Sequence, residues 1–120
     1  MEFNVVVLSG VLSADPEHRT FDSGASLLRC LVTVRSESPR RVDVIPITLW
    51  DPSEQVLNEI SRRGQRVWVA GMVQRRFWAA ADGRESRIEI VARAIELSND
   101  DRHDLAIRRW VSGGSVVEPH

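Results

Sequence analysis

Residues 65–97 read QRVWVAGMVQRRFWAAADGRESRIEIVARAIEL. Over residues 65–79, apolar and polar side chains alternate, as they do in a β-strand with one buried face. Asp82 and Gly83 then provide a tight turn, and the alternation resumes over residues 85–97. This part of the chain therefore predicts a long β-hairpin.

Three further strands are predicted before the hairpin. They cover residues 3–14, 25–36 and 42–50, which are rich in β-branched and apolar side chains. Gly10 lies inside the first of them, where a glycine relieves crowding between backbones, so we expect a bend or bulge there. Residues 15–24 form a polar connection between strands that is closed by Gly24.

Residues 51–64, DPSEQVLNEISRRG, form the clearest helix in the sequence. Asp51 is a suitable N-cap and Pro52 suits the first helical position. Arg62 and Arg63 fall in the expected last turn, where cations favour the helix dipole. The apolar stripe is narrow, which indicates a helix that plugs a core; it consists of Val56, Leu57 and Ile60.

Three strands, one helix and two strands, in that order, describe a mainly all-β protein. We interpret it as a five-stranded Greek-key barrel, the OB-fold, with one capping helix between the third and fourth strands. We expect this domain to cover residues 1–98. Residues 99–120 would form a short C-terminal extension, with a short helix over 99–112 followed by a tail.

The alternation also predicts which strand residues face the core. In the second strand the inward set includes Cys30, the single cysteine, which we expect to be a small buried residue rather than a reactive thiol. In the third strand Ile45, Ile47 and Leu49 share the inner face, so Pro46 and Thr48 are expected to point outward. Proline has no ladder donor, which favours an unpaired point or bulge at that position.

Composition excludes several classes of protein. No stretch of the chain approaches the ~18 apolar residues of a membrane span. The acidic start of the chain does not resemble a secretory signal, and one cysteine fits a reducing compartment, so we expect a cytoplasmic protein without a membrane partner. The three histidines are scattered without metal-ligand spacing, so we expect no metal, no cofactor and no enzymatic activity.

The formal net charge of −1 gives no overall argument for a nucleic-acid partner, although all 16 basic residues are arginine. The indication of such a partner comes instead from the way outward-facing residues are grouped. Arginines are interleaved there with exposed aromatic and amide side chains, and the candidate nucleic-acid-binding residues are Arg29, Arg35, Arg41, Trp50, Gln74, Arg76, Trp78, Arg84 and Arg87.

This grouping suits single-stranded DNA. Guanidinium groups can follow the phosphates, and aromatic rings can stack on unpaired bases whatever the base is, whereas a duplex hides its base faces. RNA is an alternative ligand on the same features. The main rival hypothesis is an OB-fold assembly subunit that uses the same face for protein contact and has weak DNA affinity.

Several segments resemble the bacterial single-stranded DNA-binding proteins over residues 4–97. NVVVLSGVLSADPEHR, residues 4–19, is similar to that family's first strand and the connection after it. DVIPITLWD, residues 43–51, is similar to its third strand. SRRGQRVWVAGMVQRRFW, residues 61–78, resembles the strand that ends in a tryptophan before the hairpin turn.

The resemblance implies an OB-fold that binds single-stranded DNA without sequence preference, usually as a homotetramer, in DNA replication, recombination and repair. It also implies an association with the nucleoid. Position by position, Trp50 and Trp78 match stacking aromatics of the family, and Arg76 matches a basic binding position.

Two departures from the family pattern also carry expectations. Val44 and the loop 36–41 lack the usual aromatic side chains, which predicts weaker binding per subunit. The sequence ends in SVVEPH instead of a long linker with an acidic tip that recruits other proteins. It is either truncated or a shorter paralogue, and we favour a paralogue that does not recruit partners through such a tip.

Overall fold

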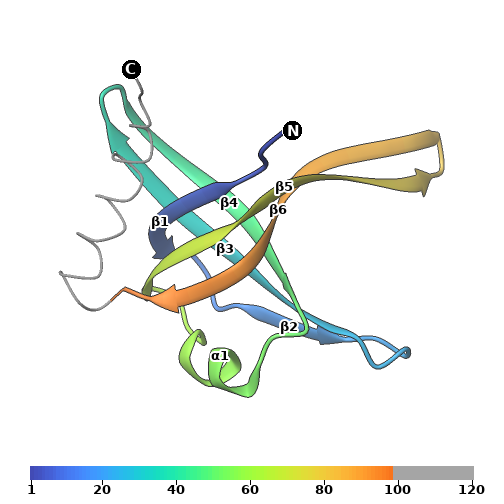
Figure 1. The fold of residues 1–120 in the computed structure, drawn as a ribbon, viewed down its shortest axis with the longest axis horizontal. Helices are drawn as coiled ribbons and strands as arrows, with labels where there is room; N and C mark the ends of the chain where they lie inside the picture. The colour runs from blue at the N-terminus through green and yellow to red at the C-terminus, as the bar shows by residue number, and fades with distance from the viewer. Residues whose placement is uncertain (99–120) are drawn as a thin grey trace.

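Six strands and one helix make up the part of the chain described by this computed structural model, residues 1–98 (Figure 1). In chain order they are β1 (Val6–Leu12), β2 (Glu17–Thr20), β3 (Ser26–Glu37), β4 (Arg40–Trp50), α1 (Glu54–Glu59), β5 (Arg66–Ala80) and β6 (Gly83–Leu97). The helix predicted over 99–112 and the tail after it lie outside the described residues.

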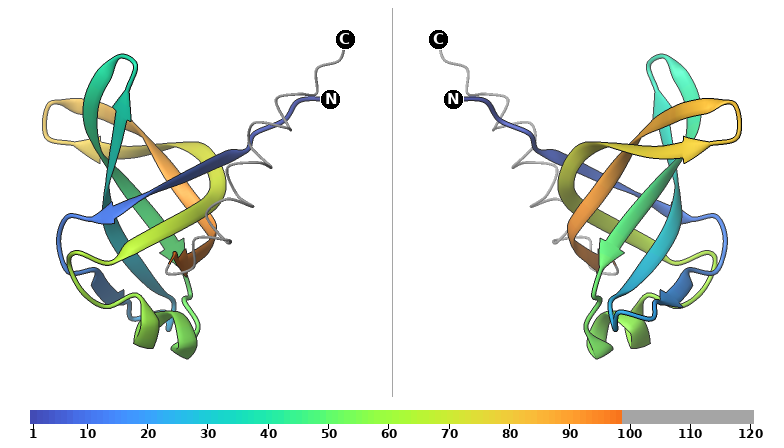
Figure 2. Two further views of the ribbon diagram at one scale, coloured as in Figure 1. Left: turned by 90° about the vertical axis from the view of Figure 1, so that its left-hand side faces the viewer. Right: turned by 90° about the vertical axis from the view of Figure 1, so that its right-hand side faces the viewer.

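Five of the strands close into a barrel (Figure 2). The hydrogen-bonded order is β1, β5, β6, β4, β3, and β3 pairs with β1 again through Val11 and Leu12. Neighbouring strands are antiparallel except β4 and β6, which run parallel. With α1 between β4 and β5, this is the predicted mainly all-β OB-fold barrel with a single helix, so the fold class is confirmed.

The polar connection 15–24 contains a short strand that the sequence analysis did not predict. Strand β2 lies along the outer edge of β3, where Glu17 pairs with Arg29 and Thr20 pairs with Ser26. All four side chains of β2 are exposed. Alternation of hydrophobic and polar residues therefore gives no signal for this strand.

The core follows the predicted inward positions of the strands. Its largest fully buried side chains are Leu12, Cys30, Val32, Ile47, Ile60, Val67 and Val69. Burial raises the pKa of the Cys30 thiol to about 11, so the thiol is protonated at neutral pH. The prediction for Thr48 was wrong: this residue is only 4% exposed, between its strand partners Arg29 on β3 and Val91 on β6.

Pro46 lies within a regular strand, at a position that needs no N–H donor. It is paired with Leu31 of β3, whose carbonyl oxygen accepts a hydrogen bond from the Ser13 N–H instead of from β4. The nitrogen of Pro46 therefore faces the other edge of β4. Pairing with β6 starts only at Ile47, so the proline interrupts no ladder bond.

Two glycines mark close approaches between backbones. A Cβ atom at Gly10 would lie 2.2 Å from the carbonyl oxygen of Thr33, and one at Gly71 would lie 2.2 Å from that of Val91. Neither position can hold a side chain without separating two strands. Gly71 also adjoins a β-bulge, because the β5–β6 register shifts there and leaves Arg93 as the extra residue of β6.

Helix α1 is shorter than predicted, and its N-cap is Ser53 rather than Asp51. The Ser53 Oγ accepts a hydrogen bond from the Val56 N–H at 3.2 Å. Asp51, whose φ is 48°, instead accepts the N–H of Ser26 at 3.0 Å and so ties the end of β4 to the start of β3. The predicted cap was wrong because this contact between strands uses the Asp51 carboxylate.

The C-terminal end of α1 is closed by a side chain from outside the helix. The Gln65 Oε1 accepts the N–H groups of Ser61 and Arg62, and its Nε2 donates to the Glu59 carbonyl. Arg62 and Arg63 therefore lie beyond the helix instead of in its last turn. The buried Ile60 follows the helix and closes this end of the barrel.

The β5–β6 hairpin projects well beyond the barrel (Figure 1). Its last pair is Ala80 with Gly83, so the turn consists of residues 81 and 82, and Gly83 adopts a φ of 128°. The tip of the β3–β4 hairpin lies on the other side of the molecule in the same view. Within residues 1–98, no helix is long and apolar enough to cross a membrane.

The approach at Gly10 gives a test of barrel closure. We expect Gly10→Ala to lower the free energy of unfolding by about 1–3 kcal/mol, because the added methyl group meets backbone rather than a movable side chain. The neighbouring exposed Ser9→Ala is the control and should change it by less than about 0.5 kcal/mol. Urea unfolding followed by circular dichroism measures both, and equal midpoints would contradict the prediction.

Candidate nucleic-acid interface

The β5–β6 hairpin has two faces, because strand side chains alternate and directly paired residues share a face. One face carries three predicted site residues of β5 and their β6 partners. We call it the Trp78 face; it consists of Gln74, Arg76, Trp78, Glu85, Arg87 and Glu89. The opposite side, which we call the Phe77 face, consists of Val73, Arg75, Phe77, Arg84, Ser86 and Ile88.

Trp50 joins the Trp78 face from β4. It lines a hollow of about 150 Å³ together with Gln74, Arg75, Arg76 and Glu89. The Arg76 guanidinium is 3.7 Å from the Glu89 carboxylate, and the Arg76 side chain is half exposed. The structure thus brings Trp50, Gln74 and Arg76, all predicted site residues, around one concave surface.

Both predicted stacking rings are accessible. Trp50 and Trp78 are each 40% exposed. The Arg87 guanidinium carbon lies 5.4 Å from the centre of the Trp78 ring, a cation–π distance. A flat ligand can therefore reach Trp78, and the arginine that accompanies the ring is already in place beside it.

Phe21 is a site neighbour that the sequence analysis missed. Its ring centre lies 6.1 Å from that of Trp50, with the two planes tilted by 34°. Phe21 belongs to the stretch that was interpreted as a polar connection, and strand β2 and its turn carry it to the end of β4. The hydrogen bonds between Ser26 and Asp51 hold the start of β3 against the end of β4. This tertiary contact brings Phe21 close to Trp50, and the sequence alone does not show it.

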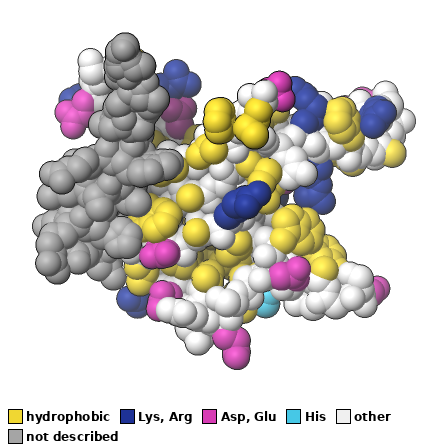
Figure 3. Space-filling model, viewed as in Figure 1, with side chains coloured by type: hydrophobic (Ala, Val, Ile, Leu, Met, Phe, Trp, Pro, Cys, Tyr) yellow, Lys and Arg dark blue, Asp and Glu magenta, His cyan; other side chains and the backbone are white. Residues whose placement is uncertain are grey.

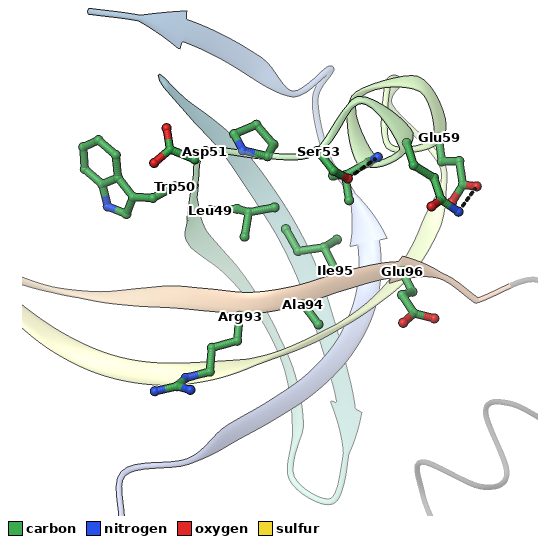
Figure 4. Close-up of a pocket in the computed structure, with 12 residues that line it drawn as sticks. Leu49, Trp50, Asp51, Ser53, Glu59, Arg93, Ala94, Ile95 and Glu96 are labelled. Atoms are coloured by element: carbon green, nitrogen blue, oxygen red, sulfur yellow. Dashed lines mark hydrogen bonds between the residues drawn. The ribbon is translucent and has the colours of Figure 1, made fainter. Parts of the chain in front are cut away.

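Arg93 is a second missed neighbour. A larger hollow of about 480 Å³ runs between β6 and α1, and Trp50 and Arg93 lie at one end of it (Figure 4). Glu59 and Glu96 lie at its other end. Asp51 also lines this hollow, beside Trp50, so carboxylates lie at both ends and Arg93 is the one basic residue among the described residues of the lining. The parallel β4–β6 pairing that brings Arg93 there has no signal in the sequence.

The remaining predicted arginines do not share one surface. Arg84 lies on the Phe77 face, with its guanidinium carbon 4.6 Å from the Phe77 ring centre. Arg29 and Arg35 lie on β3, and Arg35 is opposite Val42. Arg41 lies on β4, not in a loop as predicted, on the face opposite to that of Arg35, and its Nε donates to both Asp43 carboxylate oxygens at 2.9 and 3.2 Å.

Side chains of the two kinds that bind nucleic acid are visible together on the projecting hairpin. Figure 3 shows hydrophobic and arginine side chains next to each other along it. In residues 1–98, no group of three or more histidine, cysteine, aspartate or glutamate side chains could hold a metal ion. The exposed rings and guanidinium groups of the site are suited to stacking and ion pairing.

Comparison with known proteins also points to proteins that bind single-stranded DNA. Residues 3–98 match the model of the single-strand binding protein family. Single-stranded DNA-binding protein 1 of Nostoc sp. is 28% identical over 98 residues, which cover 81% of this chain and 82% of that protein. A single-stranded DNA-binding protein of Staphylococcus aureus is 28% identical over 113 residues, covering 85% of this chain and 72% of its own. For one from Treponema pallidum, 26% identity extends over 102 residues, 80% of this chain and 58% of that protein.

Proposed function

This chain belongs to the single-strand binding protein family, and we propose that its Trp78 face and Trp50 bind single-stranded DNA without sequence preference. The observation that carries the proposal is that the exposed ring of Trp50 lines a hollow with Gln74 and Arg76, while the exposed ring of Trp78 lies on the same hairpin face nearer the tip. Stacking on such rings requires unpaired bases, which duplex DNA does not present.

The arginines of this face are suited to phosphate. Arg76 is held by one carboxylate contact at 3.7 Å, which is long for a charge-assisted hydrogen bond and can be exchanged for a phosphate oxygen. Arg87 is held over Trp78 and can contact the phosphate next to the stacked base. We add Arg93 and Phe21 to the proposed interface because both lie beside Trp50.

Not every predicted site residue enters this proposal equally. Arg29 and Arg35 lie on β3 and would extend the path of a strand that continues beyond Trp50. Arg41 contributes little, because its guanidinium already binds the Asp43 carboxylate. We therefore expect the Trp78 face to provide more of the free energy of DNA binding than the arginines on β3 and β4 do.

Assembly as a homotetramer and a role in DNA replication, recombination or repair are part of the proposal. The structure offers a feature that supports self-association. Strand β1 pairs with β3 only at Val11 and Leu12, so among the described strands its edge from Val6 to Gly10 is unpaired on that side. Phe3 and Val5 next to it are largely exposed, and such an edge favours strand pairing between chains.

One observation favours the alternative of a protein-binding assembly subunit. On the outer surface of β3 and β4, the side chains of Leu31, Val42 and Val44 are exposed where a stacking protein would present rings. An aliphatic patch of this kind suits a protein contact. In that case DNA would bind weakly and the Trp78 face would be covered by protein.

Truncation of the exposed ring tests the proposed function. We expect Trp78→Ala to weaken binding of oligo(dT) by about 1–3 kcal/mol, the usual contribution of one base–aromatic stack. Val42→Ala, which shortens an exposed side chain without a ring, serves as the control and should leave the affinity unchanged. Fluorescence anisotropy of a labelled oligonucleotide measures both, and an unchanged affinity for Trp78→Ala would place the site elsewhere.

The ion-pairing role of Arg76 gives a separate prediction. Arg76→Ala should flatten the dependence of log K on log salt concentration by about 0.7 for each phosphate of a single strand that the arginine no longer neutralises. Arg63→Ala is the matched control, since Arg63 is an exposed arginine in the connection between α1 and β5. Equal salt slopes for the two variants would remove Arg76 from the phosphate path.

The proposed assembly is tested by sedimentation. We expect a species of four times the 13.6 kDa chain mass, and Val5→Glu should shift it to smaller species because it places a charge beside the open β1 edge. A monomer in the unaltered protein would exclude the tetramer. DNA would then have to bind to a single copy of the barrel.

A further inference from the structure

The Phe77 face is exposed although its positions continue the inward side of the barrel. Further down the same strands, Val69 and Ile95 form a buried pair. On the hairpin, Phe77 is 52% and Ile88 is 56% exposed. The hairpin projects past the end of the barrel, so this side of it has no interior to pack against (Figure 1).

The charge of the Phe77 face differs from that of the Trp78 face. The Trp78 face balances two arginines against Glu85 and Glu89. The Phe77 face carries Arg75 and Arg84 and no carboxylate. Within the described residues neither of these arginines makes an ion pair; Arg75 donates to the Ser86 Oγ at 3.0 Å, which keeps it on this face.

The ring of this face is arranged in the same way as Trp78 on the other side. The Arg84 guanidinium lies 4.6 Å above Phe77, as Arg87 lies 5.4 Å from Trp78. An aromatic ring with an arginine beside it provides a stacking platform and a phosphate contact at one place. The Phe77 face therefore has the same chemistry as the Trp78 face and a more positive charge.

The tip of the hairpin connects the two faces. A shallow hollow of about 450 Å³ extends from Phe77 to Trp78 and is otherwise lined by Ala79, Ala80, Gly83 and Arg84. The small side chains at the tip leave the backbone uncovered by bulky groups. An extended polymer can therefore pass from one ring to the other around the tip.

We propose that the Phe77 face is a second site for single-stranded DNA, so that one bound strand passes around the hairpin tip and stacks on both Trp78 and Phe77. This inference rests on the proposed function. The occupant is chosen by charge: two arginines without a carboxylate attract a polyanion, whereas a second copy of this chain would bring an identical positive face.

A tryptophan moved to the second face tests the inference. The variant Trp78→Leu is compared with the double variant Trp78→Leu, Phe77→Trp during titration with oligo(dT). We expect the double variant to show additional fluorescence quenching, because the introduced indole stacks on a base. Quenching of the tryptophans that both variants keep, Trp50 together with Trp68 and Trp110, reports separately on the proposed function.

Truncation of the second face gives the complementary measurement. Phe77→Ala should weaken binding of long oligo(dT) about 5- to 150-fold and leave short oligonucleotides that reach only the Trp78 face unaffected. Val42→Ala is the control, since it removes a similarly exposed side chain that has no ring and lies on β4, outside both faces of the hairpin. Circular dichroism verifies that these surface variants fold.

The outcomes separate the two proposals. If the shared tryptophans are quenched but the introduced indole is not, and Phe77→Ala binds long oligo(dT) normally, the second site is wrong while the proposed function stands. If Phe77→Ala and Ile88→Ala instead both reduce self-association and neither affects DNA binding, the Phe77 face is a contact between copies, which also overturns the inference. If the shared tryptophans are not quenched either, the proposed function itself fails.

Discussion

Direct packing of backbone on backbone at Gly10 and Gly71 is the constraint on which the rest of this structure depends. At both places a β-carbon would lie 2.2 Å from a carbonyl oxygen of a neighbouring strand. These approaches close the barrel and seal Val32, Val67 and Val69 from water. Beyond the closure the β5–β6 hairpin has no interior, so its two faces are both free to present aromatic rings.

Local pairing, rather than net charge, explains how a chain with a formal charge of −1 can bind a polyanion. Arg76 is placed by Glu89, and Arg87 and Arg84 are placed by the rings beneath them. The guanidinium groups are thus positioned before a ligand arrives, which reduces the entropic cost of binding. Arg93 adds a cation near Trp50 in the hollow along α1, whose acidic lining residues are Asp51, Glu59 and Glu96.

Alternation of side chains made the barrel strands, the inward face of β3 and the exposure of Trp78 predictable from sequence. It could not find β2, whose four side chains are all exposed. It also could not decide between Asp51 and Ser53 as the N-cap of α1, because the Asp51 carboxylate is used in a contact between strands. The parallel pairing of β4 with β6 depends on tertiary structure. The sequence placed Arg84 and Arg87 in one candidate site, but the structure separates them onto two faces of the hairpin.

Titration with oligo(dT) and with a matched duplex, at two salt concentrations and with tryptophan fluorescence as the signal, tests the central claim most directly. Stacking of bases on Trp50 and Trp78 predicts quenching by the single strand alone, with an affinity that falls as salt rises. Equal quenching by the duplex, or no quenching by either ligand at low salt, would contradict the claim and assign the exposed rings to a protein partner.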